Sequence, residues 1–483
     1  MYCLERLSRI VLCLLLLRLG SVPALADVLK ATINSPASLS VPPVTLSQAL
    51  EKAVKNYPSV QTSQARIQGN QAGITLARTA YLPHFDLLLQ ENRATRNNIS
   101  GQLLPQLIIP SMTGPVINNP TAGSAWDSAA GALLNWEPFD FGLRRANVDL
   151  AKTQLDTAKA NLQLTELNVV TSVSDAFFKV LSAKVAVQTQ AAKVKRAQVF
   201  VETVTARVNE GLRPGVDLAR AIAEAASAQI VYTQALGKEK LALAALAQAM
   251  GDAGQDMDIQ GKAFWSPPTE VIMPVERVDS HPRLIVQKST VAQVKAKEHS
   301  LSVSYRPKIN VQGSFFGRGS GVDPEGHLQG GANGLVPTRA NAAVGITVIM
   351  PVMNIATLRA QQRMERANES AELSRYNEMK QEILGAITQA KILAETASSV
   401  AEQTPLELKA ARASEVQTRS RYAAGLSTTL EVADAERQLT QAEVEDALAK
   451  IDVWRSRLNQ YLVQGDVKGF NNLVREIEQG ANR

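Results

Sequence analysis

The amino-acid sequence predicts a mainly α-helical fold of long antiparallel hairpins, with a smaller β portion and with one structural unit present twice. A stretch between two Ala-rich segments, RVNEGLRPGVDLARA (residues 207–221), returns in altered form as RYAAGLSTTLEVADA (residues 421–435), 214 positions later. Apolar residues recur at seven-residue intervals over long segments, which is typical of helices packed side by side. Aromatic residues make up only 5% of the 483 residues, which also favours long helices over a conventional globular core.

The first 26 residues are predicted to be a secretory signal peptide. Arg6 and Arg9 precede an apolar run from Ile10 to Leu17, and Ala24-Leu25-Ala26 provides a cleavage site of the A-x-A type. A membrane anchor is the alternative, but the run is much shorter than the roughly 20 residues that a spanning helix needs. We therefore expect a mature chain that starts at Asp27.

The composition excludes several classes of protein. Both cysteines, Cys3 and Cys13, lie in the predicted signal peptide, so the mature chain has no disulfide, catalytic thiol or cysteine metal site. Cleavage removes three Arg and one Glu, which lowers the formal net charge from +6 to +4. Acidic and basic residues are interspersed, and nucleic-acid binding therefore gets no support. No later segment is apolar enough to cross a membrane as a helix.

The two copies of the unit run in the same order. Tyr81-Leu82-Pro83 corresponds to Tyr305-Arg306-Pro307, and Pro138 corresponds to Pro351. In each copy we expect a short helix, two strands around a loop, a helix of about 65 residues and a helix of about 35 residues. The predicted divisions are a first repeat over residues 27–264, a second repeat over residues 265–464 and a C-terminal tail over residues 465–483.

Each repeat should begin with a helix that ends at its Tyr-x-Pro motif, over Ser59–Tyr81 and Arg283–Tyr305. A strict seven-residue repeat in the long helix keeps one face towards a neighbouring helix. The valines that form this repeat are Val173, Val180, Val187, Val194, Val201 and Val208. Pro405 falls inside the second long helix, where we expect a kink or a break.

Four segments beside Gly/Pro/Asn-rich loops alternate between apolar and polar residues, as the strands of a membrane β-barrel do. A small soluble sheet would show the same alternation. Trp126 and Trp136, near segment ends, favour the membrane, because aromatic residues gather at its interfaces. Lipid does not tolerate an open sheet edge, so several chains are needed, and three would supply twelve strands. The segments are His84–Asn92, Ser124–Trp136, Lys308–Phe316 and Asn341–Met350.

Together these features resemble the TolC-like outer-membrane efflux protein family over residues 44–464. The duplicated plan and the Tyr-x-Pro motifs carry the resemblance, with Pro138-Phe139-Asp140-Phe141-Gly142 at the start of the first long helix. The turns Glu210-Gly211-Leu212 and Ala424-Gly425-Leu426-Ser427 also resemble the periplasmic hairpin tips of the family. The start of the second long helix, Pro351-Val352-Met353-Asn354-Ile355, lacks the Asp-Gly pattern that is usual in the family.

The resemblance implies a homotrimer in the outer membrane that extends into the periplasm, with a trimeric α-barrel below a twelve-stranded β-barrel in outer-membrane lipid. It implies a passive exit duct of a tripartite efflux pump or of a type I secretion system. The partners implied are a periplasmic adaptor (membrane fusion) protein and an inner-membrane transporter, with no cofactor. A non-transporting structural or adhesion protein that spans the periplasm is the alternative.

The sequence predicts neither an enzyme nor a metal site. The four histidines are scattered, and none has a carboxylate or a second His at the spacing of metal ligands. Gly317-Arg318-Gly319-Ser320-Gly321 lacks the Lys and the strand-to-helix setting of a phosphate-binding loop. We expect a flexible extracellular loop at these glycines.

Two acids follow the second turn of the repeated stretch. Glu431 and Asp434 are three residues apart on one face of a helix, one turn after Gly425. Acids near a helix N-terminus are favoured by the helix dipole, so a solvated surface is one interpretation. The resemblance implies another, in which acids at these positions ring the inside of a constricted periplasmic mouth.

Further residues near the turns take their expected roles from the same resemblance. It implies that Asp217, Arg220 and Ser427 contribute to contacts that close the mouth, although some members have Arg in place of Ser427. It also implies that the hairpin tips dock with the adaptor. These tip residues are Gly211, Leu212, Arg213, Gly425 and Leu426.

Overall fold

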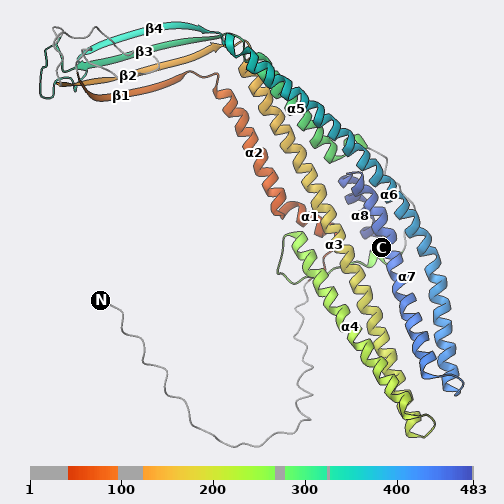
Figure 1. Ribbon diagram of the computed structural model, residues 1–483. Helices are drawn as coiled ribbons and strands as arrows, with labels where there is room; N and C mark the ends of the chain where they lie inside the picture. The colour runs from red at the N-terminus through yellow and green to blue at the C-terminus, as the bar shows by residue number, and fades with distance from the viewer. Residues whose placement is uncertain (1–41, 96–122, 267–277, 324–326, 481–483) are drawn as a thin grey trace, which may run out of the picture. The chain divides into compact units, whose positions relative to one another are not determined.

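A computed structural model describes residues 42–95, 123–266, 278–323 and 327–480 (Figure 1). The predicted signal peptide, residues 1–26, lies outside the described residues. The first set of elements is α1 (Leu46–Asn56), α2 (Pro58–Thr79), β1 (His84–Thr95), β2 (Ser124–Phe139), α3 (Leu143–Asn209), α4 (Gly215–Met250) and the 3-10 turn η1 (Lys262–Phe264). The second set is η2 (Val278–Ser280), α5 (Pro282–Val303), β3 (Lys308–Ser320), β4 (Arg339–Ile349), η3 (Val352–Asn354), α6 (Ile355–Ala423), α7 (Thr429–Val463) and α8 (Val467–Gly480).

The predicted order of elements is confirmed, since α2-β1-β2-α3-α4 is followed by α5-β3-β4-α6-α7. The long helices α3 and α6 have 67 and 69 residues, and α4 and α7, their partners in the hairpins, have 36 and 35. The helix α2 ends two residues before Tyr81, because Ala80 and Tyr81 form a turn that leads to Pro83 and the sheet. Among the described residues, none of the helices has the length and apolar character needed to cross a bilayer.

The helix α6 continues through Pro405, so of the kink or break expected there the break does not occur. A proline removes one backbone donor but leaves the neighbouring turns bonded. Packing against α7 supports α6 at this point, where the buried Thr404 hydroxyl donates to the Asp446 carboxylate at 3.3 Å. The cost of the missing hydrogen bond is thus offset by contacts between the two helices.

The heptad face of α3 forms the seam of the helical region. Val173 and Val180 are fully buried, and the later valines of the repeat are half-buried. Beside Val173 and Val180, Phe177 and Phe178 pack edge-to-face on Phe264 of η1, with ring centroids 6.1 and 5.3 Å away. This cluster joins α3 to α1, α7 and α8, and the same seam continues along α3 and α7 towards the turns.

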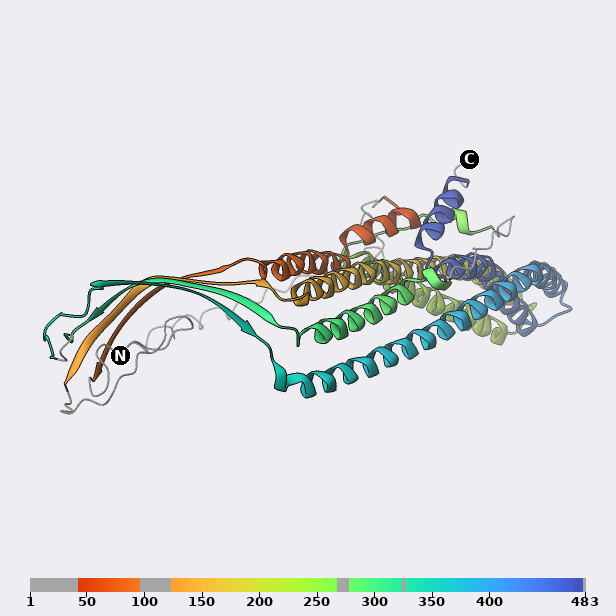
Figure 2. The ribbon, with the colours of Figure 1, turned by 90° about the horizontal axis from the view of Figure 1, so that it is seen from above.

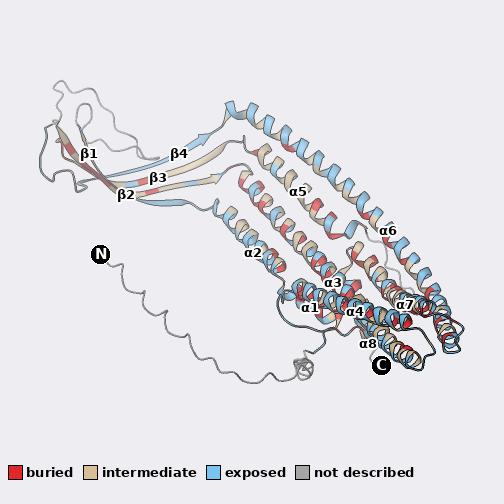
Figure 3. Ribbon diagram, turned by 60° about the horizontal axis from the view of Figure 1, so that its bottom comes forward, coloured by how far each residue is buried: buried red, intermediate tan, exposed pale blue. Residues whose placement is uncertain are grey.

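The four strands form one antiparallel sheet in the order β1-β2-β3-β4 (Figures 1 and 2). The register of the strands places the apolar residues of all four segments on one face, as predicted. Large apolar side chains on that face are exposed, such as Leu87 (82%), Val344 (86%) and Ile346 (73%). All residues of β4 are exposed in the single chain (Figure 3). Within the chain, β1 and β4 each have one edge that pairs with no other described strand.

The glycine-rich motif is not a loop, which corrects the expectation from sequence. Residues 317–320 form the last part of β3: all four pair with β2, and the first two also pair with β4. Residues 334–337 lie against the end of β3, so that a Cβ atom on Gly319 would lie 2.4 Å from the Val336 carbonyl oxygen. On Gly317 it would lie 2.9 Å from Pro337. These positions need glycine for close packing and not for flexibility.

The two long helices start differently. At the start of α3 the Asp140 carboxylate accepts hydrogen bonds from the backbone N–H groups of Gly142 (3.1 Å) and Arg144. The Arg144 guanidinium binds Asp140 at 3.1 Å and lies 4.7 Å from the Tyr81 ring, which ties the helix to the turn before β1. The start of α6 has the short turn η3 and no side-chain cap. The start of α6, which lacks the Asp-Gly pattern, therefore also lacks the side-chain cap that Asp140 gives α3.

Candidate functional site at the hairpin turns

The repeated stretch forms the turns between α3 and α4 and between α6 and α7, and both turns have the same backbone geometry. Gly211 and Gly425 adopt left-handed conformations, with φ of 73° and 79°. The next N–H in each turn, of Leu212 or Leu426, returns to the carbonyl five residues earlier at 2.9 Å. This is the glycine-terminated helix end that L-residues with a Cβ rarely form. It leaves Leu212 and Leu426 exposed at 68% and 69%.

A stack of two arginines on Tyr422 joins the turns of the two hairpins. The Tyr422 ring is 1% exposed, and the guanidinium groups of Arg207 and Arg213 lie 5.5 and 4.8 Å from its centre. Arg207 also donates to the carbonyls of Tyr422 (2.9 Å) and Ala423 (2.7 Å), and Arg213 donates to the Ser427 carbonyl (3.0 Å). Arg213, expected at an exposed docking tip, is therefore half-buried between the hairpins.

Asp217, Arg220 and Ser427 are not brought together in the single chain. Asp217 is buried in the first turn of α4 (8% exposed), and Arg220 is exposed on the next turn. Ser427 is buried, and its hydroxyl donates to the Thr418 carbonyl at 3.4 Å. Among the described residues, no hydrogen bond or ion pair connects these three side chains to one another.

Glu431 and Asp434 are both exposed at the start of α7. Glu431 completes a capping box: its backbone N–H donates to the Thr428 hydroxyl, and its carboxylate accepts from the Thr428 N–H. Asp434 forms an ion pair with Arg437 on the same helix. In the single chain, both acids are therefore explained as solvated residues on the surface of a helix. The negative charge of Asp434 is neutralised by Arg437 to a greater extent than that of Glu431.

An ion network that links the two hairpins was not predicted from the sequence. The network lies along α3, about four helical turns from the tip. Arg196 of α3 binds two acids of α7, Glu436 at 2.9 Å and Glu443 at 3.1 Å, and also the Thr440 hydroxyl at 3.2 Å. Burial opposes the charge of Arg196, but the two carboxylates outweigh it and raise the pKa of its guanidinium. The three partners of Arg196, at positions 436, 440 and 443, lie on one face of α7 because of their spacing. This spacing is the only feature of the sequence that could have indicated the network.

Glu436 extends this network to the second hairpin. Arg419 of α6 binds Glu436 and also binds Glu415, one turn away, at 2.6 Å. Burial raises the pKa of Glu415, and the nearby Glu436 adds to the effect. The network therefore connects α3, α6 and α7 through one shared carboxylate.

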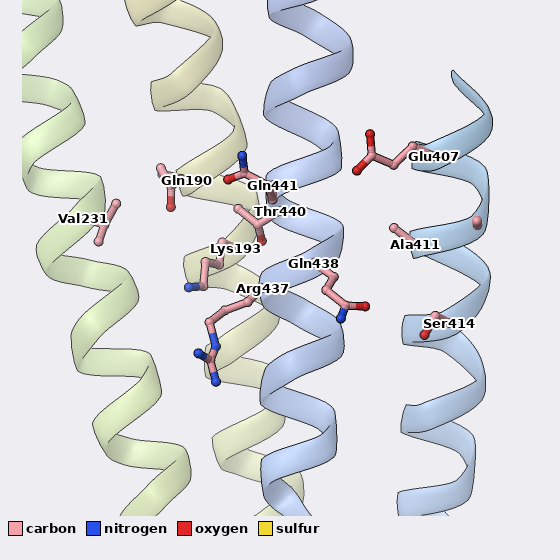
Figure 4. Close-up of a pocket in the computed structure, with 11 residues that line it drawn as sticks. Gln190, Lys193, Val231, Glu407, Ala411, Ser414, Arg437, Gln438, Thr440 and Gln441 are labelled. Carbon is pink, nitrogen blue, oxygen red and sulfur yellow. The ribbon is translucent and has the colours of Figure 1, made fainter. Parts of the chain in front are cut away.

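A groove of about 730 Å³ runs between the two hairpins beside this network (Figure 4). All four helices of the hairpins contribute to it: Gln190 and Lys193 lie on α3, Val231 on α4, Ser414 on α6 and Arg437 on α7. On α6 it is lined by Glu407 and by the small residues Ala410, Ala411 and Ser414. Over the part of the chain that the structure describes, no group of three or more His, Cys, Asp or Glu side chains could hold a metal ion.

Long paired hairpins, a four-stranded sheet with an exposed apolar face and glycine-ended turns define a channel-type protein of the outer membrane. The sequence profile of the outer membrane efflux protein family matches residues 49–252 and 292–462, which is most of the chain. The chain belongs to this family. It is accordingly an outer-membrane protein that extends into the periplasm and functions in transport, and it is not an enzyme.

Solved structures share the fold at low sequence identity. The CmeC outer membrane channel of Campylobacter jejuni has a TM-score of 0.71 and 15% identity, and the alignment covers 89% of both chains. The OprN outer-membrane channel has a TM-score of 0.70 and 17% identity, over 88% of this chain and 90% of that one. The open state of the MtrE outer membrane channel of Neisseria gonorrhoeae has a TM-score of 0.68 and 18% identity, over 87% and 88%.

One relative is similar over part of its length. Protein CyaE of Bordetella pertussis is 24% identical over 208 residues, which are 43% of this chain and 40% of that protein. The chain thus matches less than half of the length of this relative.

Proposed function

We propose that the protein is the exit duct of a tripartite efflux pump or of a type I secretion system, and that three copies form one passive channel. The observation that carries the proposal is the sheet, whose outer edges on β1 and β4 pair with no other described strand and whose apolar face is exposed. An open edge in lipid leaves backbone donors and acceptors unsatisfied. Three copies joined edge to edge remove all edges, give twelve strands, and turn the apolar face to outer-membrane lipid.

The helical part of the duct is a tunnel of six hairpins, two from each copy. Exposed apolar residues along the hairpins support contacts with neighbouring copies, because a soluble surface seldom presents so many along a helix. They include Ile222, Ile230 and Leu241 on α4 and Leu393, Val400 and Leu406 on α6. We assign residues 27–264 and 265–464 to the two repeats that supply these hairpins, and residues 465–483, which include α8, to a tail.

The periplasmic end of the tunnel docks with an adaptor protein that is bound to an inner-membrane transporter. The tip residues Gly211, Leu212, Gly425 and Leu426 are exposed, and two of them are large apolar side chains that an adaptor can cover. Arg213 holds the hairpins together behind this surface.

The mouth of the tunnel lies near the turns. Threefold symmetry repeats Glu431 and Asp434 around the axis, so that their exposed carboxylates concentrate cations at the entrance. Asp217, Arg220 and Ser427 hold the mouth shut through contacts between hairpins in the trimer. The pairing of Asp434 with Arg437 makes Glu431 the main source of negative charge.

Two measurements on the purified full-length protein test the proposal. Unheated detergent extracts should migrate as a trimer, and the protein should form conducting channels in planar bilayers. A monodisperse monomer with full β content would contradict the twelve-strand barrel. A trimer that never conducts would instead favour the non-transporting structural or adhesion protein.

A further inference from the structure

Besides the groove shown in Figure 4, a second cavity lies between the hairpins, nearer to the turns. It has a volume of about 380 Å³ and is bounded by α3, α4 and the first turns of α7. Phe200, Ala221 and Val432 form its apolar wall and belong to the buried cluster that includes Tyr422. Sites for small molecules are commonly of this size, with apolar walls and a few polar groups that fix the orientation of the ligand.

One polar group in the wall lacks the partner that its burial requires. Thr429 is 2% exposed and lines the cavity, and its hydroxyl has no hydrogen-bond partner among the described residues. An unsatisfied buried hydroxyl is costly, since it has lost its bonds to water without a replacement. Thr428, and not Thr429, caps α7, so helix capping does not account for this side chain.

The charges around the cavity leave one cation in excess. Lys193 binds Glu224 at 3.2 Å, Glu436 binds Arg196 at 2.9 Å, and Arg437 binds Asp434. Arg220 also lines the cavity and has no ion pair in the described part of the chain. An arginine is suited to bidentate binding of a carboxylate, and the bond is strengthened where water is partly excluded.

We propose that this cavity binds a small amphipathic carboxylate. Its apolar body lies on Phe200 and Val432, and its carboxylate accepts hydrogen bonds from the Arg220 guanidinium and the Thr429 hydroxyl. Such a ligand contacts α3 and α4 of one hairpin and α7 of the other, and therefore stabilises their present arrangement. The site requires neither conduction nor a particular cargo, but it uses Arg220, which the proposed function places among the contacts that close the mouth. Thr429→Val tests the cavity without changing those contacts.

The test uses the full-length protein in lipid nanodiscs and measures binding of 2-naphthoate by calorimetry. Neutral 2-naphthol, which lacks the charge, and acetate, which lacks the apolar body, are the ligand controls. Thr429→Val keeps the shape of the side chain and should weaken binding about three- to tenfold. Arg220→Gln should weaken it at least tenfold, because hydrogen bonds to charged groups contribute more.

The matched control is Arg421→Gln, which removes an exposed arginine at the same end of the molecule but outside the cavity wall. Saturable binding of one 2-naphthoate per protomer, weakened in the two cavity variants and unchanged in the control, supports the proposal. Absence of saturable binding, or equal affinity in Thr429→Val and the unmodified protein, overturns it. In those cases a neighbouring copy or water fills the cavity, or the probe only partitions into lipid.

Discussion

At the scale of single residues, His281 is the clearest case of a side chain whose burial sets its chemistry. It is 4% exposed at the N-terminus of α5, and its Nδ1 accepts a hydrogen bond from the Arg283 N–H at 3.1 Å. Burial, together with the positive charge of Arg283, lowers the pKa of the imidazole to about 4. The neutral ring is the form that caps the helix, because protonation of Nδ1 would remove the acceptor.

The folded protein should therefore lose stability in acid through His281. An unfolded histidine has a pKa of about 6.5, so between pH 6.5 and pH 4 the unfolded chain takes up a proton that the folded chain does not. The stability is complete above pH 6.5, and up to about 3 kcal/mol is lost as the pH falls to 4. His281→Asn keeps a capping acceptor that does not titrate. Urea unfolding at both pH values should show a smaller loss for this variant, and an equal loss would contradict the assignment.

The sequence predicts the backbone of the turns better than their side-chain contacts. Gly211 and Gly425 could be placed at the tips because a left-handed helix end has a local signature. The stack of Arg207 and Arg213 on Tyr422 could not, since both arginines are more than 200 positions from Tyr422 in the chain and meet it only through the packing of the hairpins. Arg213 was accordingly assigned to the exposed tip.

At the scale of elements, periodicity determines most of the fold. The seven-residue repeat of α3, the duplication of the unit and the two-residue alternation together predicted the four hairpin helices and the four strands, with small errors at their ends. The helix break considered at Pro405 and the loop expected at Gly317–Gly321 are absent for the same reason. Residues that usually interrupt an element are tolerated where tertiary contacts compensate, and α7 and the Val336 segment supply those contacts.

The ion network of Arg196 should contribute to the association of the two hairpins. Arg196→Met removes the close ion pair of the half-buried Glu443 and leaves the buried Glu436 with Arg419 alone, and we expect a loss of about 2 kcal/mol. Hydrogen exchange should become faster in α7 around these acids. Lys195→Met is the matched control, because Lys195 is exposed on the same turn of α3. Equal exchange in the two variants would show that the hairpins associate without the network.

At the scale of the whole molecule, the single chain exposes surfaces that normally lie in contact with another chain or with lipid. Apolar side chains are exposed on the sheet and on the hairpins, and the outer edges of β1 and β4 pair with no strand in the described part of the chain. Both features indicate contacts that one chain cannot satisfy. Local sequence patterns predict these faces, but they do not show which side of α7 faces the axis of an assembly. The roles of Glu431 and Asp434 depend on that orientation.

Ion selectivity distinguishes the two interpretations of these acids. If they face the axis of a trimer, Glu431→Gln should lower the cation preference of single channels and weaken block by multivalent cations. Asp434→Asn should have a smaller effect, because Arg437 already neutralises much of its charge. Glutamine can replace Glu431 in the capping box, so helix stability and assembly should remain unchanged. If selectivity and block are unchanged when both substitutions are combined, the two acids face outward. They then cap α7 and contact solvent, and they do not act on the permeating ions.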